Sequence, residues 1–387
     1  MIIGVPKEIM HDENRVSSTP ETVTKMVKDG FKVIVEKGAG AGSFYLDEDY
    51  VQAGAEMLTD PQEIYDRADI ILKVKEPQFN QALQKHEVEM MHKGQILITF
   101  IHPAAPVNHK IVKRMAEKGI VGLTLDGIPR ISRAQSMDAL SSMSVCAGYK
   151  GILMAANDIA KFIPMVGSAV GVLKPSTVFV LGTGVAGLRA VATAKSLGAI
   201  VYSADIRPEA NEQAMSLGAR IVETGIPAEI AVSPDGKHAN KLSEKWLQVE
   251  RENLKDIVSK ADIVFCSALL FGHVAPILLT EEMVKSMKPG SCIVDISIDQ
   301  GGNCAITTPG ERDIKHGVII EGIKNIPGML PSSSTWMFAQ NIYNLLKYLI
   351  KDDKIELDTN DEIVSSILVT NFEGQIVHQG TLEAMNK

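Results

Sequence analysis

Short apolar runs alternate with amphipathic stretches along the first 130 residues of the chain. The runs "IIGVP", "KVIVEKGA", "DIILKV", "QILITFI" and "GIVGLTL" are almost continuously apolar, which is typical of strands buried on both faces of a sheet. Between them, "PETVTKMVKDG", "PQEIYDRA" and "NHKIVKRMAEKG" show helical periodicity, and two of the three end in glycine, a common helix stop. This alternation predicts a mostly parallel, doubly wound sheet.

A second series of the same kind begins near residue 176, with "STVFVLG", "AIVYSAD", "RIVE", "DIVFCSA", "SCIVDIS" and "VIIEG". A helical stretch at about residues 136–165 separates the two series. After "NIPGMLPSSS" comes an amphipathic helix, "WMFAQNIYNLLKYLI", that does not continue the second series. We therefore expect an α/β fold of two doubly wound Rossmann-like domains. The first comprises residues 1–135 and is completed by the C-terminal segment 328–387; the second comprises residues 136–327.

Composition narrows the class of protein. The chain has 387 residues, 45% hydrophobic and 22% charged, which is the balance of a globular protein with a large core. Its net charge of −8 argues against nucleic acid as the main partner. The cysteines have no CxxC spacing, so we expect neither a disulfide framework nor a metal site. We see no secretory signal and no run long enough to span a membrane, and expect a soluble protein.

The segment 222–257 is the least regular stretch of the chain. Its sequence "SPDGKHAN" is polar and rich in turn-forming residues, which indicates an exposed loop. Two interpretations remain open, a surface insertion or a lid that closes over a bound ligand.

The clearest functional motif of the sequence is "VFVLGTGVAGLRAVATAKSLGAIVYSAD", residues 178–205. A GxGxxG alone is a weak signal, but this one follows an apolar strand, opens a helix and is followed by an acid at the end of the next strand. Gly182 allows the tight turn, Gly184 lets the backbone approach a pyrophosphate, and Gly187 allows close packing of helix and strand. The free N–H groups at the helix N-terminus favour phosphate. The motif predicts a dinucleotide site.

Asp205 is placed to accept hydrogen bonds from the adenosine ribose and to repel a 2′-phosphate, which favours NAD(H) over NADP(H). Arg207 leaves the alternative open, because a nearby arginine is able to bind that phosphate. "DISIDQGGNC" follows another strand, so Asp299 and Gln300 either approach the nicotinamide end or form a capped turn. The remaining nucleotide contacts are expected from Thr183, Val185, Ala186, Ile206, Ala268 and Leu269.

Residues 130–142, "RISRAQSMDALSS", concentrate arginine, glutamine, aspartate and serine between a strand-like run and a helix. Together with "VLGTGVAGLRAVATAKSLGA", "GVPKE", "ENRVSSTPETV" and "GGNC", this segment resembles the NAD(H)-binding component of proton-translocating nicotinamide nucleotide transhydrogenase, which is the first portion of a divided alpha subunit. The resemblance covers nearly the whole chain, and the segment 130–142 is its most specific element.

The resemblance implies Si-specific hydride transfer between NAD(H) and NADP(H), coupled to proton movement across a membrane. It implies a homodimer docked on the NADP(H)-binding domain of a beta subunit and on the membrane-spanning second portion of the alpha subunit, hence a cytoplasmic protein peripheral to the inner membrane. Asp138 and Ser141 would bind the carboxamide of NAD(H), Arg130 would reach the nucleotide, and Gln135 would bridge towards the partner's nucleotide. Such a reaction needs no metal, only two rings held in near-attack geometry.

Two stretches depart from the family pattern: "DGKHANKL" lacks the usual tyrosine, and "LLFGHVAP" replaces a more proline-rich stretch. Both leave the mechanism of a lid in doubt, and neither affects the expected fold.

A competing interpretation is an alanine dehydrogenase, a relative with the same two domains. Arg15, Lys75 and His102 match positions that bind a carboxylate and move a proton in that enzyme, and Asp299 matches its active-site aspartate. An arginine and a lysine beside a histidine are a sensible amino-acid site, but that enzyme lacks the segment 130–142. A third possibility is a non-catalytic NAD(H)-binding sensor.

Overall fold

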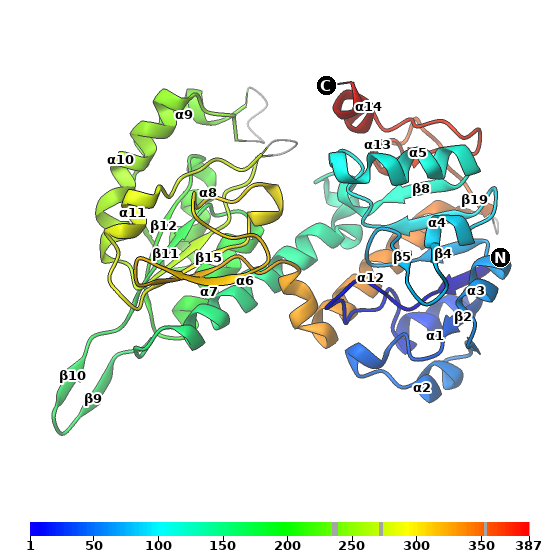
Figure 1. The fold of residues 1–387 in the computed structure, drawn as a ribbon, viewed down its shortest axis with the longest axis horizontal. Coiled ribbons are helices and arrows are strands. Elements are labelled where there is room, and N and C mark those ends of the chain that lie inside the picture. The colour runs from blue at the N-terminus through cyan, green and yellow to red at the C-terminus, as the bar shows by residue number, and fades with distance from the viewer. Residues whose placement is uncertain (234–238, 271–273, 352–353, 387) are drawn as a thin grey trace. The chain divides into compact units, whose positions relative to one another are not determined.

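The computed structural model describes residues 1–233, 239–270, 274–351 and 354–386. The chain forms two compact units (Figure 1): unit 1 comprises Met1–Met143 with Gly328–Lys387, and unit 2 comprises Ser144–Pro327. Each unit contains a largely parallel sheet flanked by helices. The expected fold class is therefore confirmed, including the completion of the N-terminal domain by the C-terminal segment.

The sheet of unit 1 has the order β20-β8-β7-β4-β1-β2-β3. Its strands are β1 (Ile2–Val5), β2 (Lys32–Glu36), β3 (Glu56–Leu58), β4 (Ile70–Leu72), β7 (Ile96–Thr99), β8 (Val121–Thr124) and β20 (Leu368–Thr370). All neighbours are parallel except β20, which runs antiparallel to β8. The Thr370 hydroxyl donates to the carbonyl of Ile120 and accepts from the N–H of Gly122, at 2.7 and 2.9 Å, which fixes the C-terminal strand at this edge.

Helices and small hairpins complete unit 1. The helices are α1 (Pro20–Lys28), α2 (Asp47–Gln52), α3 (Pro61–Arg67), α4 (Glu87–Met90), α5 (His109–Lys118), α12 (Pro331–Leu349), α13 (Glu362–Ile367) and α14 (Gln379–Met385). The hairpins are β5 (Phe79–Asn80) with β6 (Lys85–His86) and β18 (Ile350–Lys351) with β19 (Lys354–Ile355). Thr19 caps α1 and Gly119, at φ +67°, ends α5, as expected for a hydroxyl before a helix and a glycine after one.

The sheet of unit 2 has the order β13-β12-β11-β14-β15-β17-β16. Its strands are β11 (Thr177–Leu181), β12 (Ile200–Ala204), β13 (Arg220–Ile221), β14 (Ile263–Cys266), β15 (Cys292–Asp295), β16 (Arg312–Lys315) and β17 (Val318–Glu321). Only β16 is antiparallel to its neighbour. The strand order reverses between β11 and β14, and such a switch point is where open α/β sheets bind their ligands.

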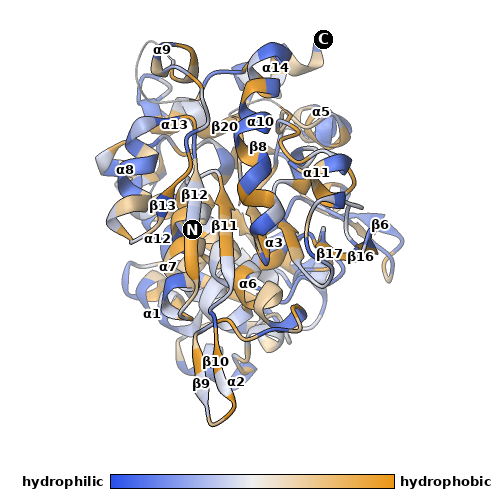
Figure 2. Ribbon diagram, turned by 90° about the vertical axis from the view of Figure 1, so that its left-hand side faces the viewer, coloured by the Kyte–Doolittle hydropathy of each residue, from blue (hydrophilic) through white to orange (hydrophobic). Residues whose placement is uncertain are grey.

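Helices cover both faces of this second sheet. They are α7 (Val185–Ser196), α8 (Pro208–Ser216), α9 (Ala228–Ala231), α10 (Glu244–Lys260) and α11 (Glu281–Lys285). One buried cluster joins the strands to Ile152, Ala190 and Ala214, and the other joins them to Leu254 and Met283. The strands are correspondingly apolar (Figure 2). Burial on both faces explains why these strands are continuous apolar runs in the sequence.

The expected helical stretch 136–165 is shorter in the structure. Helix α6 spans Ala139–Asp158, and a hairpin of β9 (Val166–Ser168) and β10 (Gly171–Leu173) follows it. Pro164 lies between them, and proline cannot continue a helix because it lacks the N–H and clashes with the preceding turn. Conversely, α12 begins at Pro331, before the expected start at Trp336, because proline is well suited to the first position of a helix.

None of the helices that the structure describes combines the length and apolar content that crossing a bilayer requires. All four cysteines are buried and are thiols. Within the described ranges, no group of three or more His, Cys, Asp or Glu side chains is arranged to hold a metal ion.

Candidate functional site

The glycine turn of unit 2 connects β11 to α7. Gly182 has φ +83°, a left-handed conformation that glycine adopts without strain. A Cβ on Gly187 would lie 2.0 Å from the carbonyl oxygen of Gly182, whereas a Cβ on Gly184 would meet nothing within 4 Å. Gly187 is therefore needed for packing, and Gly184 borders open space at the start of α7. Val185 and Ala186 are the first residues of that helix, so their N–H groups face the same opening.

Asp205 directly follows β12 and is only 9% exposed. Its Oδ2 accepts a hydrogen bond from the backbone N–H of Thr183 at 2.8 Å. The Arg207 guanidinium donates to Oδ1 through Nε at 3.0 Å and to Oδ2 through Nη2 at 2.9 Å. Asp205 is thus tied to the glycine turn and paired in bidentate fashion with Arg207, the residue that left the choice between NAD(H) and NADP(H) open. Ile206 lies between the two.

A buried polar network, which the sequence did not reveal, holds the neighbouring strand ends. The Asn303 amide donates to the carbonyl of Ala268 at 2.8 Å and accepts from the N–H of Ala268 at 2.9 Å. Asp295 Oδ2 accepts from the N–H groups of Asn303 and Cys304, both at 2.9 Å. Burial raises the pKa of Asp295, although these donors lower it. The only signal in the sequence was an acid at the end of a buried strand, shortly before "GGN".

Two other expected residues are also on the carboxyl side of the sheet. Asp299 lies in a short 3₁₀ turn after β15, and its carboxylate is 3.7 Å from Lys324 Nζ with both side chains more than half exposed. Leu269 follows Ala268 and is 44% exposed. The structure therefore brings the glycine turn, Asp205, Ala268 and Asp299 to the same edge of one sheet, since all follow parallel strands of unit 2.

The segment 130–142 belongs to unit 1, where α12 anchors it. Ala134 and Met137 are buried. The carbonyl of Ser136 accepts from the side-chain amides of Asn341 and Asn344 at 2.9 and 3.1 Å. Within the same unit, Arg133 donates to Tyr348 and Asp361, at 2.8 and 2.9 Å. These asparagines were not identified from the sequence, because a helical amphipathic pattern does not show which loop a polar residue will hold.

The four expected residues of this segment fall into two groups. The Asp138 carboxylate accepts from the N–H and the hydroxyl of Ser141, at 2.8 and 2.5 Å, so this pair caps the start of α6. Arg130 and Gln135 are exposed, and neither side chain has a hydrogen bond or ion pair with any described residue. The loop is thus held by its apolar residues and its backbone, and it leaves two polar side chains available. Its residues are in unit 1, whereas the glycine turn and Asp205 are in unit 2.

Three residues of the competing interpretation, Arg15, Lys75 and His102, belong to unit 1, whereas Asp299 belongs to unit 2. His102, at φ +48°, has Nδ1 2.6 Å from Asp126 Oδ1. Burial lowers the pKa of His102, but the Asp126 carboxylate outweighs it, and the net shift is upward. Arg15 is buried and forms a bidentate pair with Glu13, with Nε–Oε1 and Nη2–Oε2 distances of 2.7 and 2.5 Å. The charge of Lys75 lowers the pKa of both Glu13 and His102.

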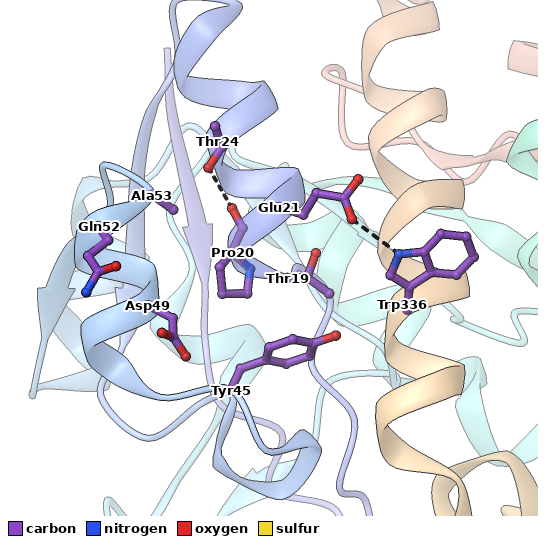
Figure 3. Close-up of a pocket in the computed structure, with 9 residues that line it drawn as sticks. All are labelled: Thr19, Pro20, Glu21, Thr24, Tyr45, Asp49, Gln52, Ala53 and Trp336. Atoms are coloured by element: carbon purple, nitrogen blue, oxygen red, sulfur yellow. Dashed lines mark hydrogen bonds between the residues drawn. The ribbon is translucent and has the colours of Figure 1, made fainter.

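A surface pocket of about 470 Å³ lies elsewhere in unit 1, between α1, α2 and α12 (Figure 3). Thr19, Tyr45 and Trp336 are among its lining residues. Glu21 accepts from the Trp336 indole at 3.2 Å and pairs with Lys25 at 2.8 Å. The Glu21 carboxylate therefore already has partners. The lining residues all belong to unit 1 and do not include the glycine turn or Asp205, so we assign the pocket no role in nucleotide binding.

Comparison with known proteins agrees with this geometry. The family model described as "Alanine dehydrogenase/PNT, C-terminal domain" matches residues 151–379. The model of the corresponding N-terminal domain matches residues 4–147. The chain belongs to the alanine dehydrogenase/PNT family. It is 39% identical to the first portion of the NAD(P) transhydrogenase alpha subunit of Rhodospirillum rubrum, over 98% of both chains.

Other members of the family are also similar to this chain, to different degrees. The crystal structure of transhydrogenase from Sinorhizobium meliloti has a TM-score of 0.85 and 35% identity, covering 97% of this chain and all of that one. Alanine dehydrogenase of Bacillus subtilis is a more distant relative, 35% identical over 88% of this chain and 82% of its own length. In sequence, the transhydrogenase subunit therefore matches more of the chain, at higher identity.

Two expectations concern residues outside those described. Most of "SPDGKHAN", the candidate lid, falls in 234–238, and three residues of "LLFGHVAP" fall in 271–273.

Two glycine substitutions separate packing from binding. Gly187→Ala places a Cβ against the Gly182 carbonyl, so we expect unfolding free energy to fall by roughly 1–3 kcal/mol and NADH binding to be lost with it. Gly184→Ala meets open space and an allowed φ of −70°. It should leave stability almost unchanged yet weaken NADH binding at least tenfold, about 1.4 kcal/mol. Urea denaturation and fluorescence titration measure the two effects; equal stability of both variants would contradict this account.

Proposed function

We propose that this chain is the NAD(H)-binding component of a proton-translocating transhydrogenase, in which a hydride passes with Si specificity between NAD(H) and NADP(H). The observation that carries the proposal is the combination, in one chain, of the glycine turn with an anchored loop that leaves the side chains of Arg130 and Gln135 without partners among the described residues. An exposed glutamine and arginine on a rigid support are what an interface with a second nucleotide requires. The near full-length similarity to a transhydrogenase alpha subunit supports it.

The residues of unit 2 fit NAD(H). The opening beside Gly184 and the free N–H groups of α7 suit a pyrophosphate. Asp205 is near enough to the glycine turn to receive the adenosine ribose, given its hydrogen bond from Thr183. The nicotinamide end would then extend along the strand ends towards Ala268, Leu269 and Asp299. Asn303 and Asp295 keep that edge in place.

The loop 130–142 would orient the nicotinamide rather than supply affinity. Asp138 and Ser141 are the candidates for the carboxamide, and Arg130 and Gln135 for the nucleotide and the partner. Hydride transfer between two rings depends on their distance and angle, and a misplacement of about 1 Å costs on the order of a hundredfold in rate. The anchoring of Ser136 by two asparagines restricts such displacement.

The chain has one dinucleotide turn within the described residues, so a partner must hold the second nucleotide. We propose the NADP(H)-binding domain of a beta subunit and a membrane-spanning second portion of the alpha subunit as partners. The chain would then be cytoplasmic and peripheral to the inner membrane. The functional domains would be 1–135 with 328–387, and 136–327.

A second candidate function is supported by the His102–Asp126 pair. A carboxylate that holds one imidazole nitrogen leaves the other available as a general acid or base. With Lys75 and Arg15 nearby, an alanine dehydrogenase-like oxidation of an amino acid is the alternative. Arg15 is already in a bidentate pair with Glu13, so it would have to bind a substrate carboxylate through Nη1, which now contacts the Met143 sulfur at 2.9 Å.

Hydride exchange tests the first function. Mixed with an NADP(H)-binding partner domain, the chain should transfer hydride from NADPH to an NAD analogue. Gln135→Asn keeps the amide but shortens its reach, so the single-turnover rate should fall by more than tenfold, while NADH affinity changes by less than about 1 kcal/mol. Ser132→Ala, an exposed residue of the same loop, is the control. Stopped-flow transfer beside equilibrium titration gives both quantities.

A Gln135→Asn rate equal to that of the native chain would show that the loop is only a structural junction. Rapid alanine-dependent NAD reduction by the chain alone would establish the dehydrogenase instead.

We also propose that the chain is a homodimer, with the β9–β10 hairpin in its interface. Val170, Val172 and Leu173 on this hairpin are 99%, 67% and 56% exposed, and its tip is apolar (Figure 2). A two-stranded hairpin is marginally stable alone, and apolar side chains gathered on it indicate a surface that another chain covers.

Val170→Asp should shift the dimer towards monomer, raising the dimer dissociation constant at least tenfold, about 1.4 kcal/mol. Val107→Asp, a valine of unit 1 that is 83% exposed, should have no effect. Light scattering after size-exclusion chromatography measures the mass. An unchanged dimer with Val170→Asp would exclude the hairpin as the interface.

A further inference from the structure

Helix α10 carries a buried acid for which neither the fold nor the glycine turn accounts. Its inward face consists of Glu250, Leu254, Ile257 and Val258. Glu250 is only 3% exposed, and it has no hydrogen bond or ion pair with any described residue. Burying a carboxylate without a partner raises the free energy of the folded state. The packing of α10 alone therefore does not explain a glutamate on its apolar face.

Glu250 lies towards the nucleotide end of unit 2. Helix α10 leads into the amino end of β14, so its earlier turns are at the carboxyl edge of the parallel sheet. The chain just beyond β13 packs on these turns: the Asn253 amide donates to the carbonyl of Thr224 at 3.4 Å, and a Cβ on Gly225 would lie 3.2 Å from Val249. Since β13 pairs with β12, the strand that Asp205 follows, Glu250 is on the ribose side of the site.

The charges around Glu250 do not cancel. Asp205, at the end of β12, is close enough for its charge to act on Glu250, and Arg207 is paired with Asp205. Arg251, on the same helix, donates to the Ile277 carbonyl and to Glu244, at 2.9 and 2.5 Å. Burial, followed by the charge of Asp205, raises the pKa of Glu250 to about 7, against the opposing effect of Arg251. Its charge therefore changes near neutral pH.

We propose that Glu250 is a specificity-determining residue whose carboxylate, when ionised, weakens binding of the 2′-phosphate of NADP(H) at the adenosine ribose site. Arg207 is paired with Asp205, and its guanidinium is able to turn to a phosphate, so the pair does not reject NADP(H) by itself. A buried negative charge behind the pair supplies the repulsion, which is strong where water is excluded. The inference rests on the proposed function only in placing the ribose at Asp205.

The test is NADPH and NADH binding to Glu250→Gln, which keeps the size of the side chain and removes its charge. At pH about 8.5, above the usual carboxyl range, NADPH should bind roughly tenfold more tightly to the variant than to the native chain, about 1.4 kcal/mol. NADH affinity should change by less than about threefold, which is under 1 kcal/mol. Glu252→Gln, an exposed neighbour paired with Lys255 at 2.5 Å, is the matched control and should change neither.

Acidification should have the same effect on the native chain. At pH about 6, below the raised pKa, Glu250 is protonated, and the difference between the native chain and Glu250→Gln in NADPH affinity should disappear. The 2′-phosphate of NADPH itself has a second pKa of about 6. Its titration affects binding to both proteins equally, so it cancels when their affinities are compared at the same pH. A difference that stays constant between the two pH values would overturn the proposal, as would unchanged NADPH affinity of the variant at pH about 8.5.

Folding does not confound the result. Glu250 has no partner among the described residues, so Glu250→Gln exchanges one buried polar group for another of the same size without breaking a described contact, and its stability should be close to that of the native chain. Glu250→Met provides a second neutral side chain of similar volume and should give the same gain in NADPH affinity. If the native chain binds neither nucleotide, the proposed function fails, whereas NADH binding with no effect at Glu250 rejects this inference alone.

Discussion

The nucleotide site of unit 2 depends on one close contact, between the backbone of Gly182 and the first turn of α7 at Gly187. The 2.0 Å separation that a Cβ would have from the Gly182 carbonyl leaves no room for any side chain there. Because the helix lies so close to the strand, its N-terminus is at the sheet edge where β12, β14 and β15 also end. Asp205, Ala268 and Asp299 follow these strands, so one steric constraint brings to a single edge the residues that we propose for the phosphate, ribose and nicotinamide groups.

In the proposed function, unit 1 presents polar side chains to a partner and does not enclose a ligand. Polar groups of the segment 130–142 find their partners within unit 1: Asp138 with Ser141, Arg133 with Asp361, and the Ser136 carbonyl with two asparagines of α12. Arg130 and Gln135 remain without such partners among the described residues. Rigidity of the support and freedom of the two side chains arise from the same set of contacts.

Periodicity in the sequence was sufficient for the strands and for the glycine turn, because burial on both faces and the need for φ > 0 are local demands on residue type. It was not sufficient for β20 or for the hairpin β9–β10: the first depends on a pairing with β8 far away in the chain, and the second interrupts an apolar run that resembles a helix. Asn303, Asn341 and Glu250 were missed for a related reason. A polar residue in an amphipathic or turn-rich stretch acquires its role from a partner that the sequence places elsewhere.

The strand β20 also has a consequence for how the protein is made. Thr370 bonds to Gly122 across a separation of 248 residues, so the edge of β8 stays open while the ribosome synthesises everything between them. Unit 2 is one uninterrupted stretch and is free to fold as soon as it emerges, before the earlier unit is complete. An open strand edge is prone to aggregation, so the nascent N-terminal sheet stays exposed to this risk until β20 pairs with β8.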